Sequence, residues 1–224
     1  MTSAGNDIVS LEAVNVTRSK SPEFYAKILR PAEEMLFTTL DPAVLPFVEH
    51  VWLLWSVKES AYKYLRRLDP TTLFIPVKFE VQSVGFPPGF ARTPIGMEEL
   101  TGCGFASLAP ISGSIVFEGI TLFYRTLFYN ELIVSVVNHS QNFDGIHWGL
   151  KWTPDKTYAH QSALVREFAV GSLQLALGLS DLVIGKNEGG APIVLCEGKE
   201  LDVPISLSHH GEWVGYAYCL NYDF

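Results

Sequence analysis

The longest helical pattern in the chain carries charged side chains among its apolar positions. Asp41 and Pro42 supply an N-cap and a first-turn proline, and from there the pattern predicts a helix to about Leu68, bent near Pro46. The apolar stripe recurs at helical spacing, at Phe47, Val51, Leu54, Trp55, Ala61, Tyr62 and Leu65. A helix with one such stripe is expected to face a core.

The segment WSVKESAYK, residues 55–63, places three charges on this helix. Lys58 falls within the apolar stripe, where we expect a buried stem with its amine snorkelling to water and a mainly structural role. Glu59 lies at the edge of the stripe and Lys63 follows four residues later, so the two share one helix face. Such pairs are usually solvated and worth a few tenths of a kcal/mol, and the pattern alone leaves that interpretation open beside a functional one.

The rest of the chain reads mostly as strands with one further helix. Residues 5–14 predict a strand that leads into a turn, and residues 21–37 predict a helix interrupted near Pro31. Further strands are predicted at residues 73–82, in a β-meander over 114–138, at 146–152, near 181–186 and 191–195, and as paired strands over 203–220. A second helix is predicted over residues 156–178, ended by Gly178.

These elements divide into two halves of similar content. Residues 1–138 hold the first helix and the meander, with a Gly/Pro-rich segment around 84–113 that we interpret as a long loop or insertion. The polar stretch HSQNFDG, residues 139–145, is the predicted linker, and the second half comprises residues 139–224. Each half combines a helix with antiparallel strands, which predicts an α+β fold.

The bulk composition excludes several classes of protein. The chain has 224 residues, is 48% hydrophobic and 18% charged, and can therefore bury a full core. Its formal net charge of −8 argues against nucleic-acid binding, which needs a basic surface. Cys103, Cys196 and Cys219 are scattered, as is typical of a reducing compartment. No secretory leader pattern and no apolar run of membrane-spanning length occurs, so we expect a cytoplasmic protein without membrane association.

Two more polar clusters could carry chemistry. Asp7 lies in GNDIV, where an early strand ends, and a lone Asp there is usually a turn or capping residue. Ser208, His209 and His210 lie in SLSHHGEW, and adjacent histidines in a strand are more often surface or packed residues than ligands. Signatures for serine hydrolases, zinc sites and nucleotide loops (GxSxG, HExxH, Walker A, GxGxxG) are absent from the sequence. The residue types alone therefore leave the function open.

Three short segments together resemble the 4′-phosphopantetheinyl transferase superfamily. WSVKESAYK resembles its W-S-x-K-E-[SA]-x-x-K signature and is the most specific of the three. GNDIV, residues 5–9, resembles its G-x-D-[IL]-[VE] segment, and SLSHHGEWV, residues 206–214, resembles its [NS]-x-S-H-x-G-x-W-V segment. One such string would be a weak indication, but three in one chain are a strong one.

The order of these segments implies a particular architecture. In the surfactin-synthetase-activating type of the family, two similar halves form a pseudo-dimer with the Ser-His segment in the first half, whereas here that segment comes last. Residues 158–194 resemble the first half of that type, and residues 73–138 resemble the end of its second half. The order also matches the shorter holo-[acyl-carrier-protein] synthases, which carry one unit per chain and form trimers. This chain is about twice that length, so the resemblance implies a circularly permuted, pseudo-twofold enzyme that acts as a monomer.

The resemblance also implies a reaction and a site. The family moves the 4′-phosphopantetheine group of coenzyme A (CoA) to a serine of an apo acyl or peptidyl carrier protein, releases 3′,5′-ADP and uses Mg²⁺. It implies catalytic roles for Asp7, Glu59 and Lys63, with Asp7 and Glu59 as the Mg²⁺ ligands and Glu59 also as the general base. The CoA-binding residues that it implies are Lys63, Ser208, His209 and Ser162.

The chain departs from the family at several positions. Val9 stands where the surfactin-type enzymes carry a third metal carboxylate, and Ala191 replaces the lysine of their G-K-P segment. The basic segment before Ser162 is shortened, and Lys151 and Lys156 are the nearby cations that remain there. These losses leave an alternative open, a catalytically weakened module of the same fold that binds CoA or a carrier protein.

A carrier protein would need a basic docking surface on this acidic chain. Carriers are typically acidic, and the net charge here is −8, so a local patch must supply the attraction. The candidate cations follow GNDIV in the sequence, at Arg18, Lys20, Lys27 and Arg30. A solvated helix face is the alternative interpretation of these four residues. The carrier itself, whether from a fatty acid, polyketide, peptide or lysine pathway, is not specified by the sequence.

Overall fold

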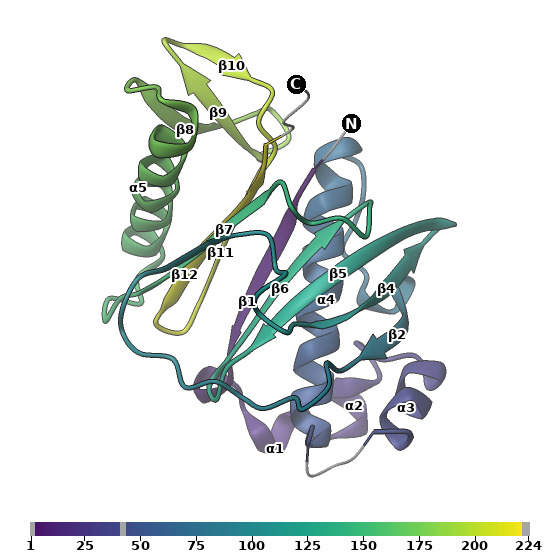
Figure 1. Cartoon of the computed structure of the whole chain (residues 1–224). Helices are drawn as coiled ribbons and strands as arrows, with labels where there is room; N and C mark the ends of the chain where they lie inside the picture. The colour runs from purple at the N-terminus through teal and green to yellow at the C-terminus, as the bar shows by residue number, and fades with distance from the viewer. Residues whose placement is uncertain (1–2, 41–43, 221–224) are drawn as a thin grey trace.

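Two long helices enclose two antiparallel sheets, as Figure 1 shows. This computed structural model describes residues 3–40 and 44–220. Three apolar clusters separate the layers: one between the first helix and the first sheet, one between the sheets, and one under the second helix. The predicted α+β class is therefore confirmed. Across the described ranges, the helices are all too short or too polar to cross a bilayer.

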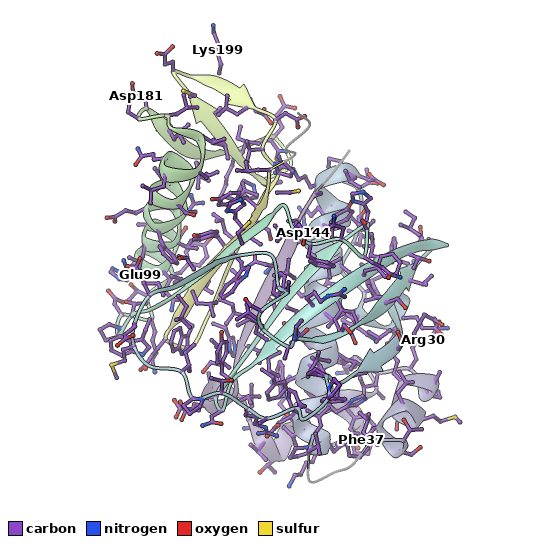
Figure 2. The ribbon with its side chains drawn as sticks, in the orientation of Figure 1. Arg30, Phe37, Glu99, Asp144, Asp181 and Lys199 are labelled. Carbon is purple, nitrogen blue, oxygen red and sulfur yellow. The ribbon has the colours of Figure 1, made fainter. Side chains whose placement is uncertain are left out.

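The first sheet belongs to the N-terminal half and is covered by the long helix α4 (Phe47–Leu68). Its strand order is β1 (Gly5–Ser10), β6 (Leu132–Asn138), β5 (Ile120–Phe128), β4 (Ile111–Phe117) and β2 (Glu80–Gly85). All neighbouring strands are antiparallel, and β4, β5 and β6 confirm the predicted meander. Three short helices precede α4: α1 (Val16–Ser19), α2 (Pro22–Tyr25) and α3 (Pro31–Thr38). Figure 2 shows side chains packed between these layers, with Arg30 and Phe37 at the end that holds the short helices.

The second sheet is covered by helix α5 (Tyr158–Leu177), which ends at Gly178 as predicted. Gly178 has a φ of 67°, the left-handed conformation that closes many helices. The strand order of this sheet is β11 (Ile205–His210), β12 (Trp213–Cys219), β7 (Ile146–Trp152) and β3 (Leu100–Cys103). A small third sheet lies at the end of α5 and has the order β10 (Lys199–Leu201), β9 (Pro192–Cys196) and β8 (Leu182–Lys186).

Strands β6 and β12 are buried along their whole length. Each is central in its sheet, and each sheet packs against a helix on one face and against the other sheet on the opposite face. A strand with two buried faces needs apolar or small residues at nearly every position rather than at alternate ones. The sequences LIVSVVN of β6 and WVGYAYC of β12 meet that requirement. The two sheets can therefore form the inner layers of the molecule.

Two predicted boundaries are wrong near prolines. The predicted start of the long helix at Asp41 and Pro42 lies outside the described residues, but the helix begins only at Phe47, with Pro46 as its N-cap instead of a bend. The strand predicted over residues 73–82 begins only at Glu80, since Pro76 opens a 3₁₀ turn. Proline fixes φ and lacks an N–H group, so it favours these irregular starts over continued regular structure.

The segment predicted as a long loop around residues 84–113 contains an extra strand, which corrects that prediction. Strand β3 pairs with β7, so this segment leaves the first sheet, adds an edge strand to the second sheet and returns to β4. The indole Nε1 of Trp148 donates to the Gly104 carbonyl at 3.1 Å, and Arg92 pairs with Glu49 on α4 at 2.5 Å. The segment therefore fastens the two halves together. Strand pairing could not be read from so short a strand in a Gly/Pro-rich context.

Lys58 does not snorkel to water, contrary to the prediction. Its side chain and that of Glu33 on α3 are both fully buried, and the Lys58 Nζ lies 2.6 Å from the Glu33 Oε2. The same ammonium group donates to the Ile28 carbonyl at 2.6 Å. The Glu33 carboxylate also accepts the backbone N–H groups of Arg30 and Val81. Burial lowers the pKa of Lys58, with Glu33 opposing. One buried ion pair therefore joins α3, α4 and β2.

Next to this pair, His50 predicts a pH dependence of stability. Its imidazole is fully buried, and burial lowers its pKa to about 4, with the contact to the Glu33 carbonyl opposing. In the unfolded chain its pKa is 6.5, so between these values the unfolded state binds the extra proton. The contribution of His50 to the free energy of unfolding is complete above pH 6.5 and is lost as the pH falls toward 4. We therefore expect this residue to lower the free energy of unfolding by about 2 kcal/mol between pH 7 and pH 5.

Chemical denaturation of wild type and His50→Gln at pH 7 and at pH 5 measures this effect. The glutamine cannot titrate, so the variant should lack this part of the slope while keeping the slope from carboxylates. Equal slopes in the two proteins would show that His50 is not held neutral in the folded state.

Candidate functional site

The two halves meet where β1 lies alongside β11. Strand β1 is paired to β6 along one edge, so its other edge presents backbone N–H groups to the second half. Side chains of β11 accept them: Asn6 N donates to Ser206 Oγ at 3.0 Å, and Ser10 N donates to His210 Nδ1 at 2.9 Å. The Asn6 Nδ2 also donates to Ser208 Oγ at 2.7 Å. This seam between the halves is thus closed by side chains rather than by a strand ladder.

A charge cluster lies on the α4 side of β1. The Lys63 Nζ lies 2.9 Å from the Asp7 Oδ1 and 3.5 Å from the Glu59 Oε1. It also donates to the Asn6 carbonyl at 3.0 Å. Successive residues of a strand face opposite sides, so Asp7 points to α4 and its neighbour Asn6 points to β11. The structure therefore brings Asp7, Glu59 and Lys63 together beside the seam.

Gly5 allows β1 to approach α4 closely enough for this cluster. A Cβ at this position would collide with the Ser60 carbonyl oxygen and would lie 2.8 Å from the Tyr64 backbone N. Both obstacles are helix backbone atoms, which cannot rotate away. The glycine of GNDIV is thus a close-approach residue, and it sets the spacing between Asp7 and the helix that carries Lys63.

We expect Gly5→Ala to destabilise the fold by about 3 kcal/mol, because the added methyl group must push β1 and α4 apart. Denaturant unfolding measures the change. Gly171→Ala is the matched control, since a Cβ at this α5 glycine would meet nothing within 4 Å. The free energy of unfolding of that variant should instead rise by up to about 1 kcal/mol, because alanine has a higher helix propensity than glycine. A Gly5→Ala protein as stable as wild type would contradict the close-approach role.

Electrostatics within the cluster favour the binding of another cation. Burial raises the pKa of Asp7 to about 7, against the opposing charge of Lys63, and Glu59 adds to the rise. Burial alone would lower the pKa of Lys63, but Asp7 and Glu59 together raise it above the usual value. One lysine therefore does not fully compensate two carboxylates. A cation placed between them would lower the pKa of Asp7 and hold both groups ionised.

The residues present fit a hard divalent cation. The second oxygen of Asp7, Oδ2, is buried and has no hydrogen-bond partner among the described residues, while Glu59 adds a partly exposed carboxylate. Mg²⁺ commonly takes one or two carboxylates and completes its shell with water and phosphate oxygens. In the described part of the chain, no group of three or more His, Cys, Asp and Glu side chains could hold a metal ion. The donor set is thus the sparse one that Mg²⁺ tolerates, and Val9 is packed in the core under α4.

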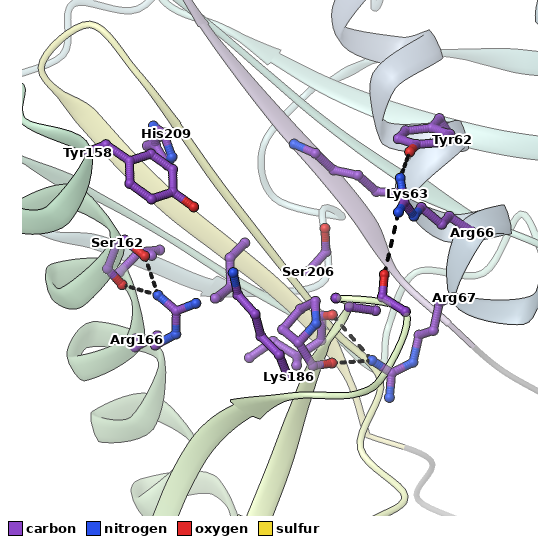
Figure 3. Close-up of a pocket in the computed structure, with 17 residues that line it drawn as sticks. Tyr62, Lys63, Arg66, Arg67, Tyr158, Ser162, Arg166, Lys186, Ser206 and His209 are labelled. Atoms are coloured by element: carbon purple, nitrogen blue, oxygen red, sulfur yellow. Dashed lines mark hydrogen bonds between the residues drawn. The ribbon is translucent and has the colours of Figure 1, made fainter. Parts of the chain in front are cut away.

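Lys63 also lines a cavity of about 360 Å³, whose lining residues Figure 3 shows. Its walls come from α4, from α5, from the turn between β8 and β9, and from β11, so both halves contribute. The cations that line it are Lys63, Arg66, Arg67, Arg166 and Lys186. None of its described lining residues is an Asp or a Glu, although the chain as a whole is acidic. Such a cavity attracts polyanions.

The predicted binding residues divide between this cavity and the seam. Lys63, Ser162 and His209 line the cavity. Ser208 is buried in the seam, where it accepts the Asn6 amide and donates to the Gly215 carbonyl at 3.3 Å. Burial lowers the pKa of His209, with nearby Lys63 adding to the effect, so its imidazole is mostly neutral at pH 7.

Four of the five cations were not among the predicted site residues. Arg66 and Arg67 follow Lys63 by three and four positions, and Arg166 follows Ser162 by four, so helical spacing could have indicated three of them. Lys186 at the end of β8 had no such signal. Lys151 and Lys156, which the sequence offered instead, pair with Glu99 and Glu212 away from the cavity.

Residues 3–86 match the family model of the 4′-phosphopantetheinyl transferase superfamily. This confirms the resemblance over the segment that carries β1, α4 and the charges Asp7, Glu59 and Lys63. No curated protein and no solved structure shows a significant match to the chain. The Ser-His segment on β11 and the two-half architecture lie beyond the matched residues, and they stay predictions.

Proposed function

We propose that this protein transfers the 4′-phosphopantetheine group of CoA to a serine of an apo acyl or peptidyl carrier protein, releasing 3′,5′-ADP, with Mg²⁺ as cofactor. This is a holo-[acyl-carrier-protein] synthase type of activity. The observation that carries the proposal is that Lys63, which is paired with the carboxylates of Asp7 and Glu59, also lines a cavity. The described residues of that lining include five cations and neither Asp nor Glu. The reaction needs a divalent cation beside a bound polyanion, and this arrangement provides both.

The proposed reaction is a substitution at phosphorus. The serine oxygen forms a bond to the phosphorus that bears pantetheine, the P–O bond to the second phosphate breaks, and 3′,5′-ADP leaves with the electron pair. Mg²⁺, when bound by Asp7 and Glu59, would neutralise charge on the pyrophosphate. Glu59 is the more exposed of the two carboxylates, so it can reach the serine and accept its proton.

The remaining site residues would bind and orient CoA. Lys63 is fixed by Asp7 and Glu59 at the rim of the cavity, where its charge stabilises the negative charge that develops on the pyrophosphate. His209 and Ser162 line the cavity and offer neutral hydrogen bonds to phosphate oxygens. Ser208 would contribute indirectly. Its hydroxyl accepts a hydrogen bond from the Asn6 side chain, which orients Asn6 and helps to keep β1 beside β11 under the ligand.

We further propose that the halves, residues 1–138 and 139–224, are related by a pseudo-twofold axis and form one complete site in a monomer. Strand pairing supports this: β1 pairs with β6, which pairs with β5, and β7 pairs with β12, which pairs with β11. In each half a long helix follows the first strand. Strand β3 is the exception, since it leaves the first half to extend the second sheet.

The alternative function is a binding module of the same fold with weakened catalysis. Val9 and Ala191 favour it, because one removes a potential metal ligand and the other removes a cation from the cavity wall. Such a module would bind CoA or a carrier protein without transferring the phosphopantetheine group.

Intact mass spectrometry of an apo carrier protein decides between these functions. The carrier is incubated with the protein, CoA and Mg²⁺, and parallel reactions omit the protein or replace Mg²⁺ by a chelator. A gain of one phosphopantetheine mass in the complete reaction alone supports the transferase. No gain with several carriers, combined with measurable binding of CoA or of a carrier, supports the binding module. If the protein binds neither CoA nor a carrier, both functions are excluded.

For carrier docking, the structure leaves two of the four candidate cations available. Arg18 stacks on Phe24, and Arg30 pairs with Glu80. Lys20 and Lys27 are exposed, and neither forms an ion pair within the described ranges. We expect the double variant Lys20→Glu/Lys27→Glu to raise the KM for an acidic carrier severalfold without changing the KM for CoA, because charge reversal repels only the carrier. Steady-state kinetics measure both constants, and an unchanged carrier KM would exclude this surface.

A further inference from the structure

The cations of the cavity differ in how far their charges are already used. Lys63 is paired with Asp7 and Glu59. Arg67 donates to the Pro192 carbonyl at 2.7 Å, and Arg66 donates to the Tyr62 hydroxyl and, at 3.4 Å, to the Gly189 carbonyl. Arg66 and Arg67 thus extend from α4 to backbone atoms of the hairpin formed by β8 and β9, and they link the two halves.

Arg166 and Lys186, by contrast, make no hydrogen bond or ion pair to a described residue of the other half, so their charges do not serve to link the halves. Neither has a carboxylate within ion-pair distance in the part of the chain that the structure describes. The Arg166 Nη1 donates to the Ser162 carbonyl and hydroxyl, which orients the guanidinium and leaves its other N–H groups for further contacts. Lys186 is exposed and forms no hydrogen bond to a described residue.

These two side chains share one part of the cavity. Figure 3 shows Ser162 and Arg166 on the α5 wall, Lys63 and Arg66 on the opposite wall, and the Lys186 side chain extending between them toward Arg166. The cavity therefore has a first cationic region beside the two carboxylates, at Lys63, and a second one at Arg166 and Lys186. A ligand with two separate phosphate groups matches this distribution of charge.

We propose that Arg166 and Lys186 form a second anion-binding subsite that holds the phosphate on the ribose of CoA and selects CoA over 3′-dephospho-CoA. The inference rests on the proposed function, which places the pyrophosphate beside Asp7, Glu59 and Lys63. The ribose phosphate is then the remaining anion, and it is close to a dianion at neutral pH. Two cations with no carboxylate partner suit it, and a guanidinium binds phosphate oxygens with two N–H groups.

The subsite also accounts for Ala191 in the turn between β8 and β9. No cation projects from that position, but Lys186 lies on the same hairpin, opposite Pro192 in the strand register, and lines the same cavity. The charge on this wall is therefore supplied by a neighbouring position of the hairpin.

Isothermal titration calorimetry with CoA and with 3′-dephospho-CoA, in the presence of Mg²⁺, tests the proposal. The proteins are wild type, Lys186→Met, Arg166→Met and the control Lys199→Met, which alters an exposed lysine at the far tip of the third sheet (Figure 2). Wild type should bind CoA at least about tenfold more tightly than 3′-dephospho-CoA. Each site variant should lose about tenfold in CoA affinity and little for 3′-dephospho-CoA, so that the preference shrinks.

The outcomes separate this inference from the function on which it rests. If wild type and Lys199→Met prefer CoA and both site variants lose the preference, the subsite is established. If the variants weaken both ligands equally, or if they keep the wild-type preference, the subsite is wrong while CoA binding stands. If wild type binds neither ligand, the proposed function fails and the subsite fails with it.

Discussion

Replacing Glu59 by alanine should lower the rate of phosphopantetheine transfer by about 10³-fold or more while leaving the fold intact. The Glu59 carboxylate has two proposed tasks, as a ligand of Mg²⁺ and as the acceptor of the serine proton. Its structural contribution is small, because its contact with Lys63 is a partly exposed i,i+4 pair at 3.5 Å. Such pairs contribute about 0.3–0.5 kcal/mol. Lys63 keeps its closer partner Asp7 in the variant.

The rate is measured by intact mass spectrometry of the carrier, and the fold by thermal unfolding. Glu167→Ala is the matched control, because Glu167 is an exposed glutamate on α5 outside the cavity. The control should keep full activity. If Glu59→Ala transfers the group at a rate near that of wild type, Glu59 is neither the base nor a required ligand, and the proposed site is wrong. If Glu59→Ala unfolds, the assay says nothing of catalysis, and Glu59→Gln, which keeps the shape, replaces it.

The sequence predicted the parts of this site that lie within one element. Glu59 and Lys63 were placed on one helix face by their spacing, and the structure has them 3.5 Å apart. Strand and helix patterns also predicted α5 and the β-meander, since long periodic segments leave little ambiguity. The family match over residues 3–86 covers this same region.

The contacts between elements could not be predicted from the pattern. The position of Lys58 in the apolar stripe indicated burial of its stem, but nothing in the spacing indicated that Glu33, on a separate helix, would be buried against its amine. In SLSHH, alternation puts Ser206 and Ser208 on one face of β11. Their hydroxyls accept hydrogen bonds from Asn6 on β1, about two hundred positions away, and the pattern gave no sign of that partner. Likewise Arg166 and Lys186 meet only because α5 and β8 border the same cavity.

The second large effect is expected at the buried ion pair between Lys58 and Glu33. Lys58→Met should lower the free energy of unfolding by about 3–5 kcal/mol. Methionine keeps most of the volume of the lysine stem, so the loss reports the charge rather than a void. The Glu33 carboxylate would remain fully buried with two backbone N–H donors and no cation, since Arg30 and Val81 contribute only their amides to it. For a chain of this size the melting temperature should fall by roughly 6–20 °C.

The double variant Lys58→Met/Glu33→Gln distinguishes two causes of the lost stability. One is the loss of attraction between Lys58 and Glu33, and the other is the cost of a buried Glu33 carboxylate that has no cation beside it. Glutamine can still accept the Val81 N–H group and carries no charge, so the double variant should recover most of the stability. Lys78→Met provides the control for loss of an exposed pair, because Lys78 and Glu118 are 3.9 Å apart at the surface. It should change stability by less than about 1 kcal/mol. A double variant as unstable as Lys58→Met would show that the buried charge of Glu33 is not the cause.

Transfer activity in the same variants would separate the roles of two adjacent residues. Lys58 points into the core toward α3, whereas Glu59, the next residue, faces the seam with Lys63. Below its melting temperature, Lys58→Met should therefore transfer phosphopantetheine at nearly the wild-type rate per folded molecule, in contrast to Glu59→Ala. Loss of activity in folded Lys58→Met would mean that the buried pair also positions the turn of α4 from which Glu59 and Lys63 project. The helix would then couple its core face to its catalytic face, and restored activity in the double variant would confirm that coupling.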